Sequence, residues 1–135
     1  MNPILKNILA VLAGLVVGNI VNGGIVFASL ITHPELKGID MQDSEAFARV
    51  MEGFGPVDYI IPFLAHALGT LTGAFVAAKI AATSKMVMAM IIGVFFLIAG
   101  IWNIMTLPYP TSMIVVDLLL AYFPMAWLGG KLGSR

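Results

Sequence analysis

Long apolar runs without a single charged residue alternate along the chain with short polar segments. Residues 7–32 and 59–78 form two such runs, the second interrupted only by His66. A third run, 86–116, is too long for one tilted helix and contains the proline-rich turn LPYPTS at 107–112. About 20 residues of helix cross the roughly 30 Å of membrane hydrocarbon. The pattern therefore predicts four membrane spans, at about 5–31, 56–79, 86–107 and 111–130.

These spans are expected to be helices. Backbone groups in lipid must be hydrogen-bonded within the protein, and the runs show no alternation with a period of two residues. The prediction is an all-α integral membrane bundle of four transmembrane helices. No second domain is expected in 1–135, because no segment outside the spans is long enough to form one.

The 32–55 connection has a different pattern. Phe47, Val50, Met51 and Phe54 recur at helical spacing, and Asp43 or Ser44 is suited to cap a short helix that ends at Gly53. We expect a short amphipathic helix here. It would lie along the membrane surface or cap the bundle, and the sequence leaves both arrangements open.

The composition agrees with a membrane location. Sixty per cent of residues are apolar, and the chain holds only seven basic and seven acidic residues, far below the quarter usual in soluble domains. We expect the lipid bilayer as its surroundings. The absence of cysteine excludes disulfides and thiolate metal sites, and the lack of a basic cluster argues against a nucleic-acid partner. No cofactor is predicted.

Basic residues flanking the spans predict the orientation. Five fall on one side of the membrane and two, Lys37 and Arg49, on the other. This bias predicts a multi-pass protein of a bacterial inner membrane with both termini cytoplasmic. An alternative is cleavage of residues 1–28 as a signal peptide, but apolar sequence continues through Ile31, so we expect no cleavage. The five residues on the cytoplasmic side are Lys6, Lys79, Lys85, Lys131 and Arg135.

Small residues at four-residue spacing mark where helices approach closely in lipid. Gly14 and Gly18 form such a pair in the first span, and Gly69 and Gly73 form one in the second. We expect these stripes to pack the two spans together, with homodimerisation as the alternative.

Polar residues at membrane depth are costly and need a partner or a function. From helical rise, Asn22 is expected to meet His66 near mid-membrane, and Asn103 is expected to lie level with Asp117 across the proline turn. These residues predict an outward-facing polar cavity for a small solute or proton; the alternative is hydrogen bonding that only fixes the packing. Asp58 is expected to act as a helix-start charge. The candidate ligand-binding or polar-core residues are Asn19, Asn22, His66, Asn103 and Asp117.

Tyrosine and tryptophan residues near the span ends are expected to anchor the helices at the membrane surface. They are Tyr59, Trp102, Tyr109 and Trp127.

Signatures of catalysis are missing from the sequence, which contains no GxSxG, HExxH or phosphate-loop motif. His33 with Glu35, Asp40 and Asp43 is a weak metal candidate, and we expect this group to be solvated charge instead. No metal site is therefore predicted.

In size and number of spans the chain is similar to the small multidrug-resistance exporters and the fluoride channels. It lacks the first-span carboxylate of the exporters and the early glycine-arginine pattern of the channels. We expect a non-enzymatic accessory or interaction subunit that binds a partner membrane protein or a second copy. The alternative is a small-solute or ion transporter or channel formed by a homo-oligomer.

Overall fold

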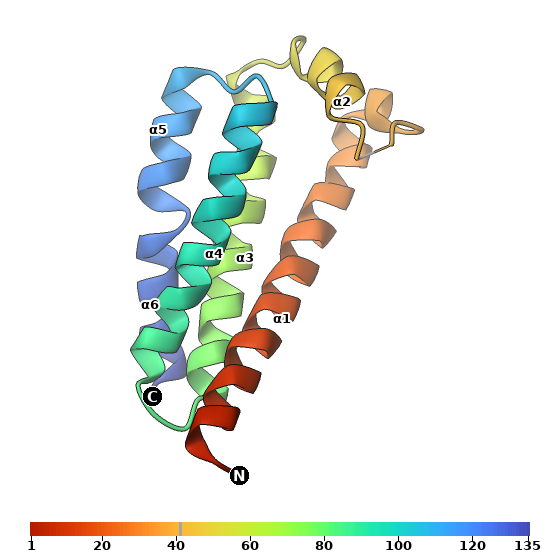
Figure 1. Ribbon diagram of the computed structural model, residues 1–135. Coiled ribbons are helices and arrows are strands. Elements are labelled where there is room, and N and C mark those ends of the chain that lie inside the picture. Colours follow the sequence, from red (N-terminus) through yellow and green to blue (C-terminus); the bar gives the residue numbers. More distant parts are fainter. Residues whose placement is uncertain (41) are drawn as a thin grey trace.

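The computed structural model describes residues 1–40 and 42–135, and in this part of the chain every regular element is a helix (Figure 1). Four segments are long and apolar enough to cross a membrane, which confirms the all-α prediction of four apolar spans. The segments are Pro3–Thr32, Pro56–Ile80, Lys85–Thr106 and Thr111–Gly133. The elements are α1 (Pro3–Thr32), η1 (Pro34–Leu36), α2 (Ser44–Met51), η2 (Pro56–Tyr59), α3 (Ile60–Ile80), α4 (Lys85–Thr106), α5 (Thr111–Leu120) and α6 (Phe123–Gly133).

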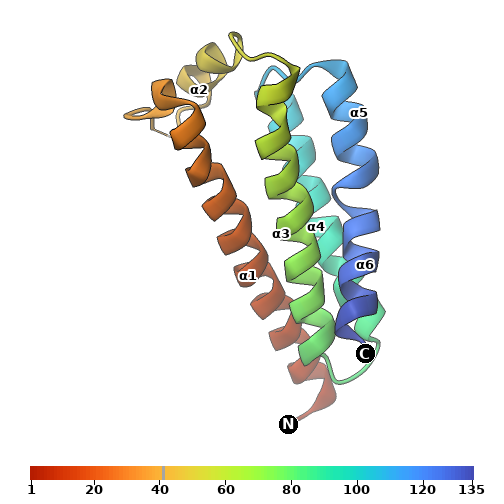
Figure 2. The same ribbon diagram turned by 180° about the vertical axis from the view of Figure 1, so that it is seen from behind.

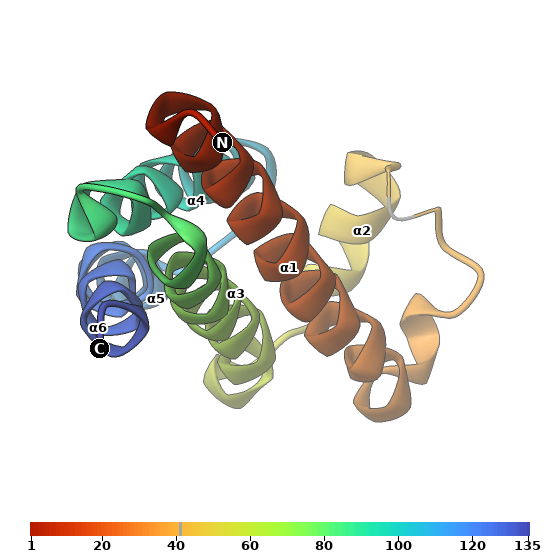
Figure 3. The same ribbon diagram turned by 90° about the horizontal axis from the view of Figure 1, so that it is seen from below.

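Helix α3 lies at the centre of the bundle, in contact with α1, α4 and α6 (Figure 3). Both chain ends lie at one end of the bundle, which we call the terminal end, and α2 lies at the other, the α2 end (Figure 1). Helix α1 is close to α3 at the terminal end and diverges from it toward the α2 end (Figure 2).

The glycine stripes account for the close approach of α1 to α3. A Cβ built on Gly14 would lie 2.5 Å from the carbonyl oxygen of Gly73, and one on Gly18 would lie 2.7 Å from that of Gly69. Such distances leave no room for a side chain. The prediction that the first two spans pack through these glycines is confirmed.

The predicted range 111–130 implied one continuous helix for the fourth span, but the structure has two helices there. The span breaks at Ala121 and Tyr122 into α5 and α6, and α6 continues to Gly133. Pro124 explains the break, because it has no backbone N–H to donate and is tolerated only in the first turn of a helix, where it stands in α6. The break turns the Tyr122 side chain into the core, where it is fully buried.

The predicted amphipathic helix is present as α2. The Asp43 carboxylate caps it by accepting a hydrogen bond of 3.0 Å from the backbone N–H of Ala46. Met51 is buried, and Phe47 contributes to the wall of a cavity below. Helix α2 lies at one end of the bundle, displaced to one side near the end of α1 (Figure 1).

Candidate functional site

A cavity lies at the α2 end, where α1 has diverged from α3 and α4. Its volume is about 380 Å³, and its wall is formed by α1, α2, α3, α4 and the segments joining them. A volume of this size falls in the range of small-molecule sites. Residues that matter below are Asn22, Val26, His33, Asp58, His66 and Trp102.

A buried polar cluster stands behind the cavity wall. The Nδ1 atom of His66 lies 2.9 Å from Oδ1 of Asp117, and the Tyr122 hydroxyl donates to Oδ2 of Asp117 at 2.6 Å. His66 is 8% exposed and Asp117 is 5% exposed. On the other side of the imidazole, the Asn103 amide nitrogen lies 3.4 Å from Nε2. Three helices and the α5–α6 break therefore contribute to a single network.

The hydrogen-bond partners assign the proton of the His66 ring. Beside an ionised Asp117, which only accepts, a neutral His66 ring donates its proton from Nδ1. Nε2 is then the acceptor, and the Asn103 amide donates to it. His66 thus contributes to the cavity wall with both ring nitrogens already hydrogen-bonded within the protein.

Tyr122 was missed by sequence reasoning. In an unbroken helix, side chains five residues apart point about 140° away from each other, so Asp117 and Tyr122 would not meet. The α5–α6 break removes this separation. Gly100 completes the site, because a Cβ at this position would collide with the Tyr122 hydroxyl and ring. The available signal was Pro124, two residues after Tyr122, which indicates a helix break just before it.

A second cavity, of about 300 Å³, lies between α1 and α4. Asn22, His66 and Asn103 contribute to both cavities, and Asn19 and Leu15 contribute to the second. The second cavity extends from the His66 region toward the terminal end. Leu15 in its wall lies about 25 Å along α1 from Thr32, the last residue of that helix at the α2 end.

The structure brings together three of the five predicted polar residues, although not in the expected pairs. Asn103 was expected to lie level with Asp117, and in the structure His66 lies between them and bonds to both. Asn22 shares both cavity walls with His66, as expected for residues at one depth. Asn19 donates to the Leu15 carbonyl oxygen of its own helix at 2.8 Å and does not join the cluster.

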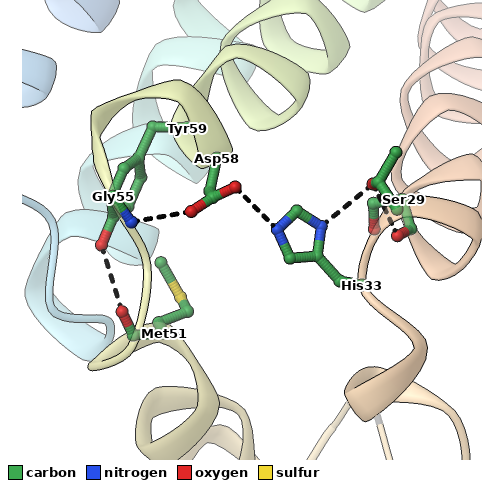
Figure 4. A network of polar contacts seen from close by, with 7 residues as sticks. Ser29, His33, Met51, Gly55, Asp58 and Tyr59 are labelled. Atoms are coloured by element: carbon green, nitrogen blue, oxygen red, sulfur yellow. Dashed lines mark hydrogen bonds and ion pairs between the residues drawn. The ribbon is translucent and has the colours of Figure 1, made fainter.

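A second polar pair contributes to the wall of the same cavity (Figure 4). Nε2 of His33, at the end of α1, lies 3.1 Å from Oδ1 of Asp58 in η2, and Oδ2 of Asp58 accepts from the Gly55 N–H at 2.7 Å. The Phe54 ring packs on His33 with 4.5 Å between centroids. Asp58 thus occupies the first turn of its span, as predicted, and also links that span to α1.

His33 had been considered only as a weak metal candidate. Within the described residues no group of three or more His, Cys, Asp or Glu side chains is placed to hold a metal ion. Its contact with Asp58 spans 25 residues of sequence, and no local pattern predicts it.

Three of the four expected surface anchors lie at or near this site: Trp102 and Tyr109 contribute to the cavity wall, and Tyr59 packs against Tyr109. Tyr59 is 4% exposed, and its hydroxyl donates to the Pro108 carbonyl oxygen at 3.1 Å, so its assignment as a membrane-surface anchor was wrong. Tyr109 packs against Tyr59 with 5.4 Å between centroids, and burial raises the pKa of the Tyr109 hydroxyl. Trp102 and Trp127 are well exposed, as anchors would be.

Comparison with known proteins gives no further guidance, because no family model, curated protein or solved structure matches the chain.

Proposed function

We propose that the chain is a non-enzymatic, multi-pass membrane protein that acts by binding, with a small solute held in the cavity at the α2 end. The observation that carries this proposal is the position of His66. Its Nδ1 is held by the buried Asp117, and its ring contributes to the wall of a cavity of about 380 Å³. Small-molecule sites combine apolar and aromatic walls with a few fixed polar groups, and this cavity has both.

Interhelical packing alone explains this arrangement less well. Hydrogen bonds that serve only to join helices contribute about 0.6 kcal/mol on average in a membrane. An ionisable side chain at membrane depth costs several times more, about 2.5–3.5 kcal/mol for an aspartate at a helix centre. A functional role for Asp117 is therefore the better explanation.

The proposed location is the inner membrane of a bacterium, with the α2 end outside and both chain ends in the cytoplasm. Support comes from the basic residues, because Lys79 and Lys85 flank the turn that joins α3 to α4 at the terminal end, and Lys6 and Lys131 lie in the adjoining helix ends. A reporter enzyme fused after Arg135 is expected to remain cytoplasmic. Export of that reporter would contradict the orientation.

The binding proposal is tested with two matched substitutions on α1. Val26 contributes to the cavity wall, whereas Val16 is 59% exposed on the lipid-facing side. Native mass spectrometry of protein extracted in mild detergent should detect a retained small molecule in the wild type and in Val16→Phe, and lose it in Val26→Phe. Equal retention by both variants, or no retained molecule in the wild type, would contradict the proposal. The same spectra report a second copy or a partner membrane protein.

Transport is the second candidate function, favoured by the second cavity. It extends the polar wall from His66 toward the terminal end. Transport predicts that a solute retained in the first experiment crosses liposome membranes containing the protein, and that Asp117→Asn abolishes this flux. Retention without flux would leave binding as the function and exclude transport of that solute.

A further inference from the structure

We infer that the ligand of the α2-end cavity is a small organic cation with an aromatic or other flat apolar part. This inference rests on the proposed function, since it names the ligand class of the same cavity. Three features of the cavity point to it: the charge of its surroundings, the free capacity of Asp58 and the aromatic residues in its wall.

The charge around the cavity favours a cation. Residues 32–59 hold six acidic and only two basic residues, and the one remaining acidic residue, Asp117, stands directly behind His66. Among the described residues that form the wall, none is Lys or Arg, whereas Asp58 is one of them. A cleft with walls of one charge sign concentrates ligands of the opposite sign. An anion would meet no positive partner here apart from a protonated histidine.

Asp58 has capacity for a further hydrogen-bond donor. Each of its two oxygens has one protein partner, His33 for Oδ1 and the Gly55 N–H for Oδ2. A carboxylate accepts about four hydrogen bonds, and 36% of the Asp58 side chain is exposed. An ammonium group can therefore bind Asp58 without displacing His33.

The aromatic residues supply the second half of the recognition. Phe47, Phe54, Trp102 and Tyr109 all contribute to the wall. Aromatic faces attract organic cations through the ring quadrupole and also cover flat apolar groups. Asp58 lies eight residues before His66, or about 12 Å along the span. A ligand with its ammonium at Asp58 thus has cavity wall on the His66 side to cover its apolar part.

The test uses three probes of nearly equal size: phenethylammonium, 2-phenylethanol and 3-phenylpropionate. The chain has two tryptophans, so Trp127→Phe leaves Trp102 in the cavity wall as the sole fluorescent reporter. We expect phenethylammonium to bind at least about tenfold more tightly than the alcohol, the usual gain for a hydrogen bond to a charged group. We expect 3-phenylpropionate to give no change.

Two variants in this background assign the effect to one side chain. Asp58→Asn should weaken phenethylammonium binding about tenfold and leave binding of the alcohol unchanged, which also shows that the cavity is intact. Glu52→Gln removes the same charge from the same end of the molecule at an exposed position outside the cavity wall. It should leave both affinities unchanged.

The outcomes separate this inference from the proposed function. Equal or tighter binding of the alcohol or the propionate overturns the cationic ligand class while leaving cavity binding in place. An equal loss in Asp58→Asn and Glu52→Gln overturns the role of Asp58 as the recognising group. If no probe changes Trp102 fluorescence, the inference is overturned, and the retention experiment with Val26→Phe decides the proposed function independently.

Discussion

The two halves of α1 behave in opposite ways toward α3. In the terminal half, Gly14 and Gly18 press against the backbone of α3 so closely that a Cβ has no room. In the α2 half, the same helix diverges, and Gly23 and Gly24 have nothing within 4 Å of a built Cβ (Figures 1 and 2). Glycine alone therefore does not produce close packing; a facing stripe such as Gly69 and Gly73 is also needed.

The difference also separates stability from proposed function. In the terminal half, the contact between α1 and α3 includes small residues such as Ala10 and Ala77, which are fully buried. The α2 half of α1 borders the cavity, whose wall includes His66 and the His33–Asp58 pair. The buried Asp117 stands behind His66. Polar groups that are costly in lipid thus occur where the helices separate, so that they face one another or a cavity.

The largest effect on stability is expected from adding a side chain where the terminal half of α1 contacts α3. Gly14→Val places a side chain against the carbonyl oxygen of Gly73, which cannot move aside, and should lower the free energy of unfolding by about 3 kcal/mol. Gly23→Val, on the same helix with open space around it, should change this free energy by less than about 0.5 kcal/mol. Reversible unfolding in bicelles measures both. Equal destabilisation would show that the two halves do not differ as described.

A smaller effect is expected at the boundary, where Tyr122 joins the polar cluster. Gly100→Ala should force Tyr122 from its position and lower the free energy of unfolding by about 2 kcal/mol. Tyr122→Phe removes one hydrogen bond to Asp117 and should lower it by about 1 kcal/mol.

The two changes should not be additive, because Phe lacks the hydroxyl that the new methyl group displaces. The double variant is therefore expected to lose less than the sum of the single losses in the same unfolding assay. Strict additivity would indicate that Gly100 and Tyr122 act independently.

The smallest effect on stability is expected from the contact between His33 and Asp58, at the α2 end. His33→Ala removes the link between α1 and Asp58 and should increase backbone hydrogen exchange of Ser44–Met51, while the unfolding transition hardly moves. Glu35→Ala changes an exposed neighbour in η1 and serves as the control. If backbone hydrogen exchange of α2 is equal in both variants, His33 does not stabilise α2 beside the cavity.

Much of the fold was predictable from local patterns. The four apolar spans, the Asp43-capped amphipathic helix and the pairing of the glycine stripes all follow from residue spacing and were found. The depth of polar residues was also predictable: His66 and Asn22, expected at the same depth, contribute to the same cavity wall.

The partners of these polar residues were not predictable from the sequence. Asn103 was expected to lie level with Asp117, but the position of His66 between them was not foreseen, because depth along a helix does not define which face meets which neighbour. Tyr122 reaches Asp117 only through the helix break, and His33 reaches Asp58 only because α2 and its flanking turns return the chain to the end of α1.

The sequence by itself determined the number and helical character of the apolar segments: uncharged apolar runs of this length are long enough to cross a membrane, and a backbone in lipid must be helical. Only the tertiary structure decided where the helices separate and which polar groups meet. Hydropathy and helical periodicity are properties of neighbouring residues, whereas a cavity depends on the distance between helices. That distance is determined by contacts such as Gly14 with Gly73, between residues far apart in the chain.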